Sequence, residues 1–140
     1  MSLESILSIS KKPGLFKLIT QTRSGFIAES LIDGKRLSVN SRSNISLLSE
    51  IAIYTLAEDV PLREVLKKIK TKEKGNKTSI SHKDSKDNLE EYFFSILQDY
   101  DEDRVYPSDI KKVIRWYNIL QEKDMLYLLE ETNSEEEEEE

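Results

Sequence analysis

The sequence predicts an α+β fold: a small, strongly bent antiparallel sheet, closed as an SH3-like barrel, followed by a helix and then a helical hairpin. Turn signals recur about every ten residues before residue 40, which is typical of an antiparallel meander. Later in the chain, apolar residues recur every three or four positions, as in amphipathic helices. The first 80 residues carry six more basic than acidic side chains, and the remaining 60 carry twelve more acidic than basic ones.

Tight turns separate the strands of the predicted sheet. Pro13 and Gly14 suit the centre of a type II turn, because proline fixes φ and glycine accepts a positive φ. Asp33 and Gly34 between apolar runs are a strong hairpin signal. Because short strands in an open sheet leave unpaired edges, closure into a barrel is expected. The strands are expected over residues 6–10, 15–22, 26–32 and 35–40, with a more buried strand over 51–56 and a short helical turn within 41–50.

Helical segments follow the predicted sheet. Pro61 fits the first turn of a helix over residues 61–73, where a missing N–H costs little. Asp87, with an acidic residue three positions later, has capping-box spacing at the start of the next helix. The loop 101–107 ends that helix, and Ser108 is expected to cap the one that follows.

These elements divide the chain into four parts. Residues 1–74 form the β-barrel-like unit with its C-terminal helix, 75–86 a polar linker, 87–131 the helical hairpin, and 132–140 an acidic tail. The tail is predicted to be disordered, because a run of like charges repels itself and buries nothing. A helical unit of this size rarely folds alone, so we expect it to pack on the β unit or on a second copy.

The composition argues against several kinds of chemistry. The chain has no cysteine, which excludes disulfides, thiolate metal sites and cysteine nucleophiles. Its one histidine, His82, lies in the predicted linker, where a general base would not be held in place. No apolar run is long enough to span a bilayer, and residues 1–10 lack the basic start of a signal peptide. We therefore expect a cytoplasmic protein with no membrane contact, no catalytic residues and no cofactor.

An acidic run between the last two helices resembles the start of a calcium loop. Asp99, Asp101 and Asp103 follow the D-x-D-x-D spacing. Calcium loops need glycine at the sixth position and a bidentate glutamate at the twelfth, but Arg104 and Ile110 stand there. We predict a solvated connecting loop and no metal site.

Basic residues in both halves of the chain are the candidates for partner binding. In the β unit they are Lys35 and Arg36, chosen from a basic set that comprises Lys11, Lys12, Lys17, Lys35, Arg36 and Arg42. In the last helix, Lys111, Lys112 and Arg115 lie opposite the apolar stripe, and Trp116 lies on its flank, where an indole suits a contact surface. Together with Lys35 and Arg36, these four helix residues make up the candidate partner-binding set of six.

Five segments of the chain are distinctive in order and wording: SILSISKKPGLFKLI, SGFIAESLIDGKR, EIAIYTL, VPLREVLKKIK and RVYPSDIKKVIRWYNIL. These segments resemble an uncharacterised bacterial family, a domain of unknown function with a β-rich N-terminal unit and a following helical unit. The resemblance covers residues 3–72 and 88–120 and implies a small cytosolic bacterial protein. It brings no activity, ligand or catalytic residue.

The sequence does not identify the function of the protein. Its features favour a non-enzymatic protein-interaction or scaffolding module over an enzyme. The partner would be an unknown protein or a second copy of the chain. The alternative is a nucleic-acid-associated regulator that uses the basic face of the barrel. The acidic tail would then keep the protein soluble, or mimic nucleic acid and screen that basic face.

Overall fold

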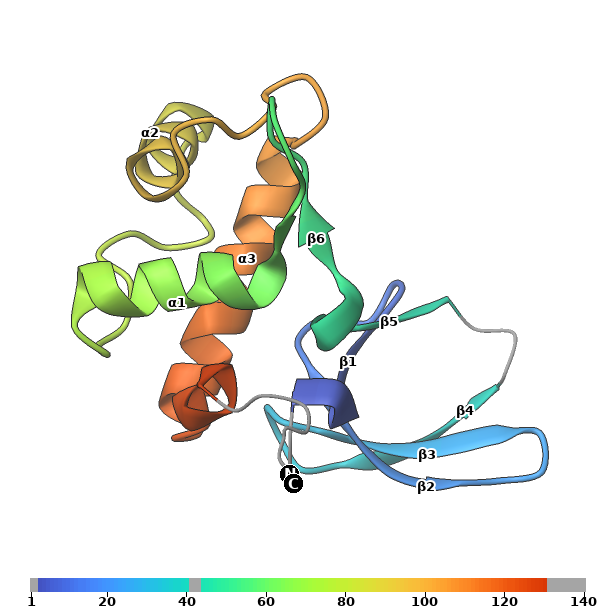
Figure 1. Ribbon diagram of the computed structural model, residues 1–140. Coiled ribbons are helices and arrows are strands. Elements are labelled where there is room, and N and C mark those ends of the chain that lie inside the picture. The colour runs from blue at the N-terminus through green and yellow to red at the C-terminus, as the bar shows by residue number, and fades with distance from the viewer. Residues whose placement is uncertain (1–2, 41–43, 131–140) are drawn as a thin grey trace, which may run out of the picture.

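The computed structural model describes residues 3–40 and 44–130 and confirms the α+β class. Figure 1 shows the helices grouped on one side of the molecule and a five-stranded sheet on the other, with a short strand between them. Arg42 and the acidic tail predicted over 132–140 lie outside the described residues.

The sheet contains five antiparallel strands in the order β4-β3-β2-β1-β5. The four strands expected before residue 40 are confirmed, with ends shifted by one or two residues. The fifth, β5, falls within the segment for which only a helical turn is expected. The strands are β1 (Ile6–Ile9), β2 (Phe16–Gln21), β3 (Gly25–Ser30), β4 (Arg36–Asn40) and β5 (Ile45–Leu47).

The prediction that the sheet closes into a barrel is wrong. Strands β4 and β5 are the two edges of an open sheet, and no pairing joins them among the described residues. The strand predicted over 51–56 does not join this sheet: β6 (Ala52–Ile53) pairs with β7 (Val60–Pro61) in a separate ribbon. The sheet is nevertheless bent, and its pairing register shifts between Leu18 and Thr20, an irregularity that increases local twist.

The buried strand expected over residues 51–56 is largely absent. Ala52 and Ile53 pair with β7, and Thr55 forms an isolated β-bridge with Tyr100, whereas Tyr54 is 43% and Leu56 77% exposed. The helical turn expected within 41–50 is confirmed as a 3-10 turn, η2 (Leu48–Glu50), and a similar turn, η1 (Leu3–Ser5), precedes β1.

Three α-helices and a final 3-10 turn follow: α1 (Leu62–Glu73), α2 (Lys86–Ile96), α3 (Pro107–Glu122) and η3 (Leu126–Leu129). Helix α2 begins one residue before the predicted start, because the Ser85 hydroxyl accepts a hydrogen bond from the Asn88 N–H at 3.2 Å. Helix α3 begins at Pro107, ahead of the predicted cap, and the Asp109 carboxylate accepts the Tyr106 N–H at 2.9 Å.

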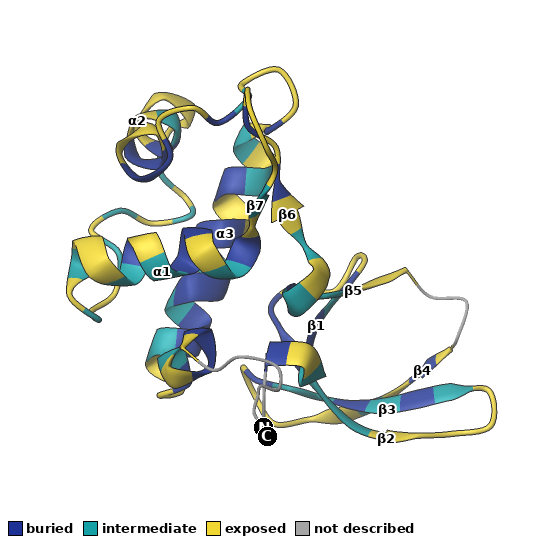
Figure 2. Cartoon of the chain, viewed as in Figure 1, coloured by how far each residue is buried: buried dark blue, intermediate teal, exposed yellow. Residues whose placement is uncertain are grey.

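One hydrophobic core joins the helices to the sheet. Leu3, Ile6 and Leu15 belong to the same buried cluster as the inner faces of α1, α2 and α3. Figure 2 shows these buried segments meeting where the helices face the rest of the chain. A second, smaller cluster fills the inside of the bent sheet, around Phe16 and Phe26. The expectation that the helical unit packs on the β unit is confirmed.

The polar segment expected as a linker is attached to the helices at several points. The Thr78 N–H donates to Asn118 Oδ1 at 3.0 Å, and Asn118 Nδ2 donates to Thr78 Oγ1 at 2.9 Å. The Tyr117 hydroxyl donates to the Asn76 carbonyl at 2.8 Å. Side chains distant in sequence therefore fix a stretch whose composition predicts mobility.

Within the described residues, no helix combines the length and hydrophobicity that a bilayer crossing requires.

Candidate functional site

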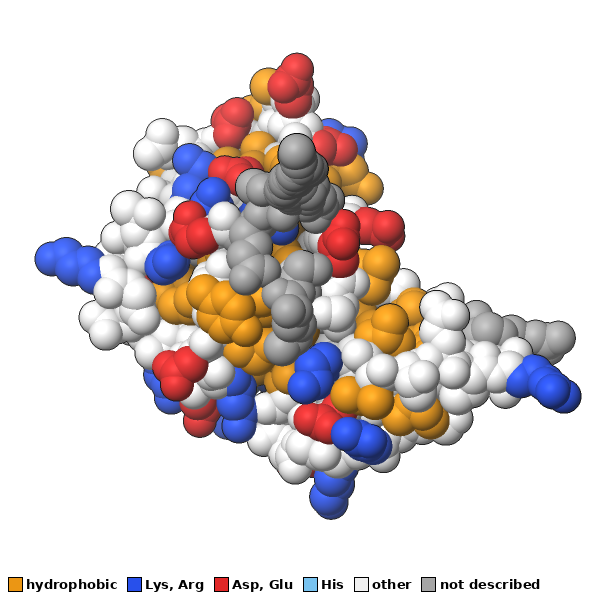
Figure 3. Space-filling view, turned by 60° about the horizontal axis from the view of Figure 1, so that its bottom comes forward, with side chains coloured by type: hydrophobic (Ala, Val, Ile, Leu, Met, Phe, Trp, Pro, Cys, Tyr) orange, Lys and Arg blue, Asp and Glu red, His pale blue; other side chains and the backbone are white. Residues whose placement is uncertain are grey.

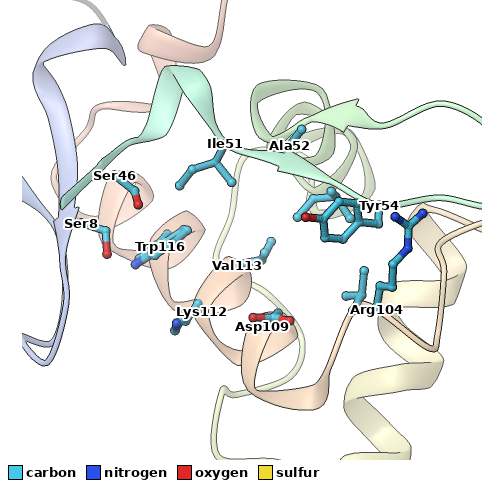
Figure 4. A pocket seen from close by; sticks show the side chains of 12 residues that line it. Ser8, Ser46, Ile51, Ala52, Tyr54, Arg104, Asp109, Lys112, Val113 and Trp116 are labelled. Carbon is cyan, nitrogen blue, oxygen red and sulfur yellow. The ribbon is translucent and has the colours of Figure 1, made fainter. Parts of the chain in front are cut away.

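A surface hollow lies on the side of α3 that faces β1 and β6. Lys112 and Trp116, four positions apart, share one face of the helix. Trp116 is only 8% exposed and, as Figure 4 shows, lies at the end of the hollow where Ser8 and Ser46 are also found. The hollow thus forms where a helix flank meets the sheet.

The first of two neighbouring cavities has a volume of about 270 Å³. Its walls come from the chain around β6, from α3 and from the loop before α3, and most are apolar. Asp109 is the one carboxylate among the described residues that line it, and it is already bonded to the start of α3. The lining residues are Ser8, Ser46, Ile51, Ala52, Ile53, Tyr54, Arg104, Val105, Asp109, Lys112, Val113 and Trp116.

The second cavity, of about 410 Å³, lies between α3 and the loop that joins β1 to β2. The loop is fixed by backbone hydrogen bonds: the Ser10 N–H donates to the Asn44 carbonyl at 2.8 Å, and the Lys12 N–H to the Ile9 carbonyl at 3.0 Å. Four cations lie around this cavity, Lys11 and Lys12 from the loop and Lys112 and Arg115 from α3.

The two cavities are adjacent, because Ser8, Lys112 and Trp116 line both of them. We call this pair of cavities the α3 groove, and its two halves the apolar end and the basic end. β1 explains where the groove begins. Ile6 and Ser8 alternate with Leu7 and Ile9, and Ile6 is fully buried in the main core, whereas Ser8 is half-buried.

Arg104 is the cation that lines the apolar end alone, and its charge is already matched. Its Nε donates to Asp101 Oδ2 at 2.9 Å, and its guanidinium stacks on the Tyr54 ring, 4.3 Å from the centroid. The hydrogen bond from Arg104 lowers the pKa of Asp101, and the same pair raises the pKa of Arg104. Arg104 therefore forms part of the wall at this end of the groove, and its charge is not available to a ligand.

The four cations of the basic end lack such partners. None of Lys11, Lys12, Lys112 and Arg115 forms an ion pair with another residue that the structure describes. His82, beside α3, responds to the excess positive charge. Burial lowers its pKa first, and Arg115, Lys83 and Lys111 lower it further. The basic end thus has the electrostatics of an anion-binding surface.

The structure brings three of the six predicted partner-binding residues together in the groove: Lys112, Arg115 and Trp116. Lys111 lines neither cavity, although its charge affects His82. In the β unit, Arg36 forms an ion pair with Glu29 at 3.1 Å, and Lys35 lies in the exposed turn where its N–H donates to Asp33. Neither of the two lines the groove.

Sequence reasoning counted Lys11 and Lys12 among the basic residues of the β unit but left them out of the partner-binding set. Both are visible as a basic pair before Pro13, but nothing in the local pattern shows that the turn lies against α3. Basic residues are otherwise dispersed. On the face seen in Figure 3, Lys and Arg side chains are spread around the outline and interleaved with acidic ones.

The acidic loop predicted from the D-x-D-x-D spacing has a structural role. Asp101 accepts hydrogen bonds from Arg104 and from the Asp103 N–H at 3.0 Å, and the Asp99 carbonyl accepts the Leu56 N–H at 2.8 Å. Among the described residues, no group of three or more His, Asp or Glu side chains is placed to hold a metal ion.

Comparison with known proteins places this arrangement in a two-part family. A family model described as a domain of unknown function, DUF5606, matches residues 3–48, and another, DUF6852, matches residues 51–120. A solution NMR structure of a protein from Bacteroides vulgatus, from a structural genomics consortium, is 47% identical. The match covers 87% of each chain, with a TM-score of 0.73.

The chain therefore belongs to this uncharacterised family, in which a DUF5606 unit precedes a DUF6852 unit. No protein of the curated set matches it. The family models meet at about residue 50, immediately before β6. The division of the chain predicted at residues 74 and 87 stays a prediction.

Proposed function

We propose that this protein is a cytoplasmic, non-enzymatic interaction module that holds a segment of a partner protein in the α3 groove. The observation that carries the proposal is the adjacency of the two cavities. Two cavities share Ser8, Lys112 and Trp116, so one extended segment could contact the apolar and the basic end at once. The absence of cysteine from the chain supports a reducing compartment such as the cytoplasm.

The residues that line the groove support binding over catalysis. General acid–base chemistry needs titratable groups aimed at one reacting position. Here the lining carboxylate, Asp109, accepts the Tyr106 N–H, and Arg104 is bound to Asp101. His82 lines neither cavity. What the groove offers is apolar surface and positive charge, which are recognition features.

Nucleic-acid binding is the second candidate, and the four cations of the basic end favour it. A protein partner accounts for more of the groove, because a phosphate backbone would use the cations but not the apolar end. Nucleic-acid binding would show a steep loss of affinity with salt, since each phosphate contact releases counterions. That salt dependence separates the two candidates.

Site-specific photo-crosslinking in native cells tests the proposal. A photoreactive amino acid replaces Ser46, which is exposed and lines the apolar end; the matched control replaces Ser38, which is exposed on β4 and lines neither cavity. We expect a protease-sensitive adduct from Ser46 only, lost when Lys112→Glu is added. Equal adducts from both positions would contradict the proposal, and a nuclease-sensitive adduct would favour the second candidate.

A further inference from the structure

From the two ends of the groove we infer the chemistry of its ligand, an inference that rests on the proposed function. The ligand is an extended acidic peptide segment that carries one apolar side chain beside its acidic residues. The apolar side chain enters the apolar end, and the acidic residues lie over the four cations of the basic end.

The size of the apolar end fits a single side chain. Its volume of about 270 Å³ is below the range of about 300–1,000 Å³ typical of small-molecule sites. Ile51, Ile53 and Val113 supply apolar walls, and Trp116 lies where the groove continues. In many protein interfaces, one aliphatic or aromatic side chain buried in such a pocket contributes a large share of the binding free energy.

The basic end selects the charge of the remaining residues. Lys11, Lys12, Lys112 and Arg115 come from two elements far apart in sequence and line one cavity. They have no ion-pair partner among the described residues, so a carboxylate ligand would not have to displace one. Complementary charge at a rim raises the association rate and rejects partners of the wrong sign.

The shared residues set the spacing along the ligand. Because Ser8, Lys112 and Trp116 border both ends, the apolar anchor and the first acidic residue must be close together in the ligand. An extended chain advances about 3.3 Å per residue, so the two residues must be near neighbours in the ligand sequence. Their closeness in sequence is therefore part of the inference.

The chain's own acidic C-terminal segment meets this description only in part. Residues 131–140 contain seven glutamates but no apolar residue. The nearest apolar side chains before them, Leu128 and Leu129, are fully buried in the main core and cannot serve as the anchor. We therefore commit to a segment of another protein, and treat binding by an acidic peptide without an anchor as the competing outcome.

The test uses the full chain and a synthetic probe, the acetylated, amidated heptapeptide Ser-Leu-Glu-Glu-Glu-Glu-Ser. Trp116 is the one tryptophan of the chain and borders both ends, so its fluorescence reports binding directly. We expect saturable binding that weakens about tenfold or more when the probe's leucine becomes serine, given the worth of one buried aliphatic side chain. Replacing the glutamates by glutamines should weaken it by a similar factor.

Variants locate the site. Lys112→Glu and Arg115→Glu should each reduce affinity, whereas Lys35→Glu makes the same charge change on an exposed residue outside the groove and should have little effect. Thermal unfolding checks that all three variants fold. Equal binding by the leucine and serine probes would overturn the anchor, and equal effects of all three variants would overturn the site.

The two proposals can fail separately. If no probe binds but the Ser46 adduct still forms and depends on Lys112, the inferred ligand chemistry is wrong while the interaction module stands. If the Ser46 adduct is absent as well, both fall. If the probe binds as inferred and no adduct forms in cells, the groove has the inferred chemistry but the proposed cellular function is contradicted.

Discussion

The two hydrophobic clusters of this protein differ in how completely they are enclosed. The main core is covered on all sides by three helices, a ribbon and one side of β1, and most of its large side chains are fully buried. The cluster inside the bent sheet is bounded by an open sheet whose edges, β4 and β5, do not meet in the described residues. One strand, β1, serves both clusters, and the α3 groove begins where its helix-facing side leaves the main core.

It follows that the helical layer contributes most of the stability of the fold, while the open sheet positions the loop between β1 and β2. The β1–β2 turn brings Lys11 and Lys12 to α3, and Leu15, just after it, is fully buried in the main core. The sheet interior retains a hollow of about 340 Å³ lined by Leu7, Leu18 and Phe26 among others. Substitutions in the two clusters should therefore have unequal effects.

The largest effect is expected from Phe93→Ala in the main core. Phe93 is fully buried, and its ring packs edge-on against Tyr100 with centroids 4.9 Å apart. Its truncation should lower the free energy of unfolding by about 3–5 kcal/mol. Phe26→Ala is the matched change in the sheet cluster, where a 9% exposed ring borders the hollow and water already reaches it. Urea unfolding should show a clearly smaller loss for Phe26→Ala, and an equal loss would contradict the comparison.

The next effect concerns the carboxylate that fastens the polar segment to the helices. Glu73 Oε2 accepts hydrogen bonds from the Tyr92 hydroxyl at 2.5 Å and from the Ser79 N–H at 2.9 Å. Hydrogen bonds to a charged group contribute about 1.5–3 kcal/mol each. Because Glu73→Gln keeps an acceptor of the same shape, we expect a loss of stability near the lower figure, measured by urea unfolding at pH 7.

The pH dependence of stability tests the same contact independently. Burial by itself would raise the pKa of Glu73, but the hydrogen bonds from Tyr92 and Ser79 outweigh it, and the pKa lies below its ordinary value of 4.5. A carboxylate with a lowered pKa stabilises the folded state above its unfolded pKa and loses that contribution as pH falls through the folded value. The parent chain should lose more stability below pH 4.5 than Glu73→Gln; parallel curves would contradict this.

Much of the fold was predictable because it depends on local patterns. The strands before residue 40 follow their turns, and α2 and α3 follow their apolar spacing. The ribbon β6–β7 was not, because two-residue strands leave no periodicity, and the buried Thr55 bonds to residues 57 and 58 and bridges to the distant Tyr100. The groove was half predictable: Lys112, Arg115 and Trp116 share a helix, but their meeting with Lys11 and Lys12 depends on tertiary packing.

A smaller effect is expected at the turn that positions the basic loop. Gly14 has φ of +86°, and a Cβ there would lie 2.5 Å from Ile32 Cδ1. The left-handed backbone alone should make Gly14→Ala lower the stability by about 1–2 kcal/mol. The clash with Ile32 should lower it further, but only modestly, because Ile32 is partly exposed and can move aside. Gly34→Ala is the control, since its φ of +74° carries the same backbone cost with open space around the new methyl group. A larger loss for Gly34→Ala in thermal unfolding would contradict the role of the Ile32 contact.

The smallest effect, and the most direct test of the field at the basic end, is on the pKa of His82. Burial is the first cause of its lowered pKa and Arg115 the second, so Arg115→Gln should raise the pKa toward 6.5 without restoring it. Lys112→Gln removes the same charge from the same helix but is not among the causes, and it should leave the pKa unchanged. The histidine ring signals in an NMR titration measure the pKa in both variants.

The same shift predicts a pH dependence of stability. Because a lowered histidine pKa makes the unfolded chain bind more protons, the parent should lose stability as pH falls below 6.5, and Arg115→Gln should lose less. Equal pKa shifts in the two variants would contradict the larger effect expected of Arg115 on the pKa of His82.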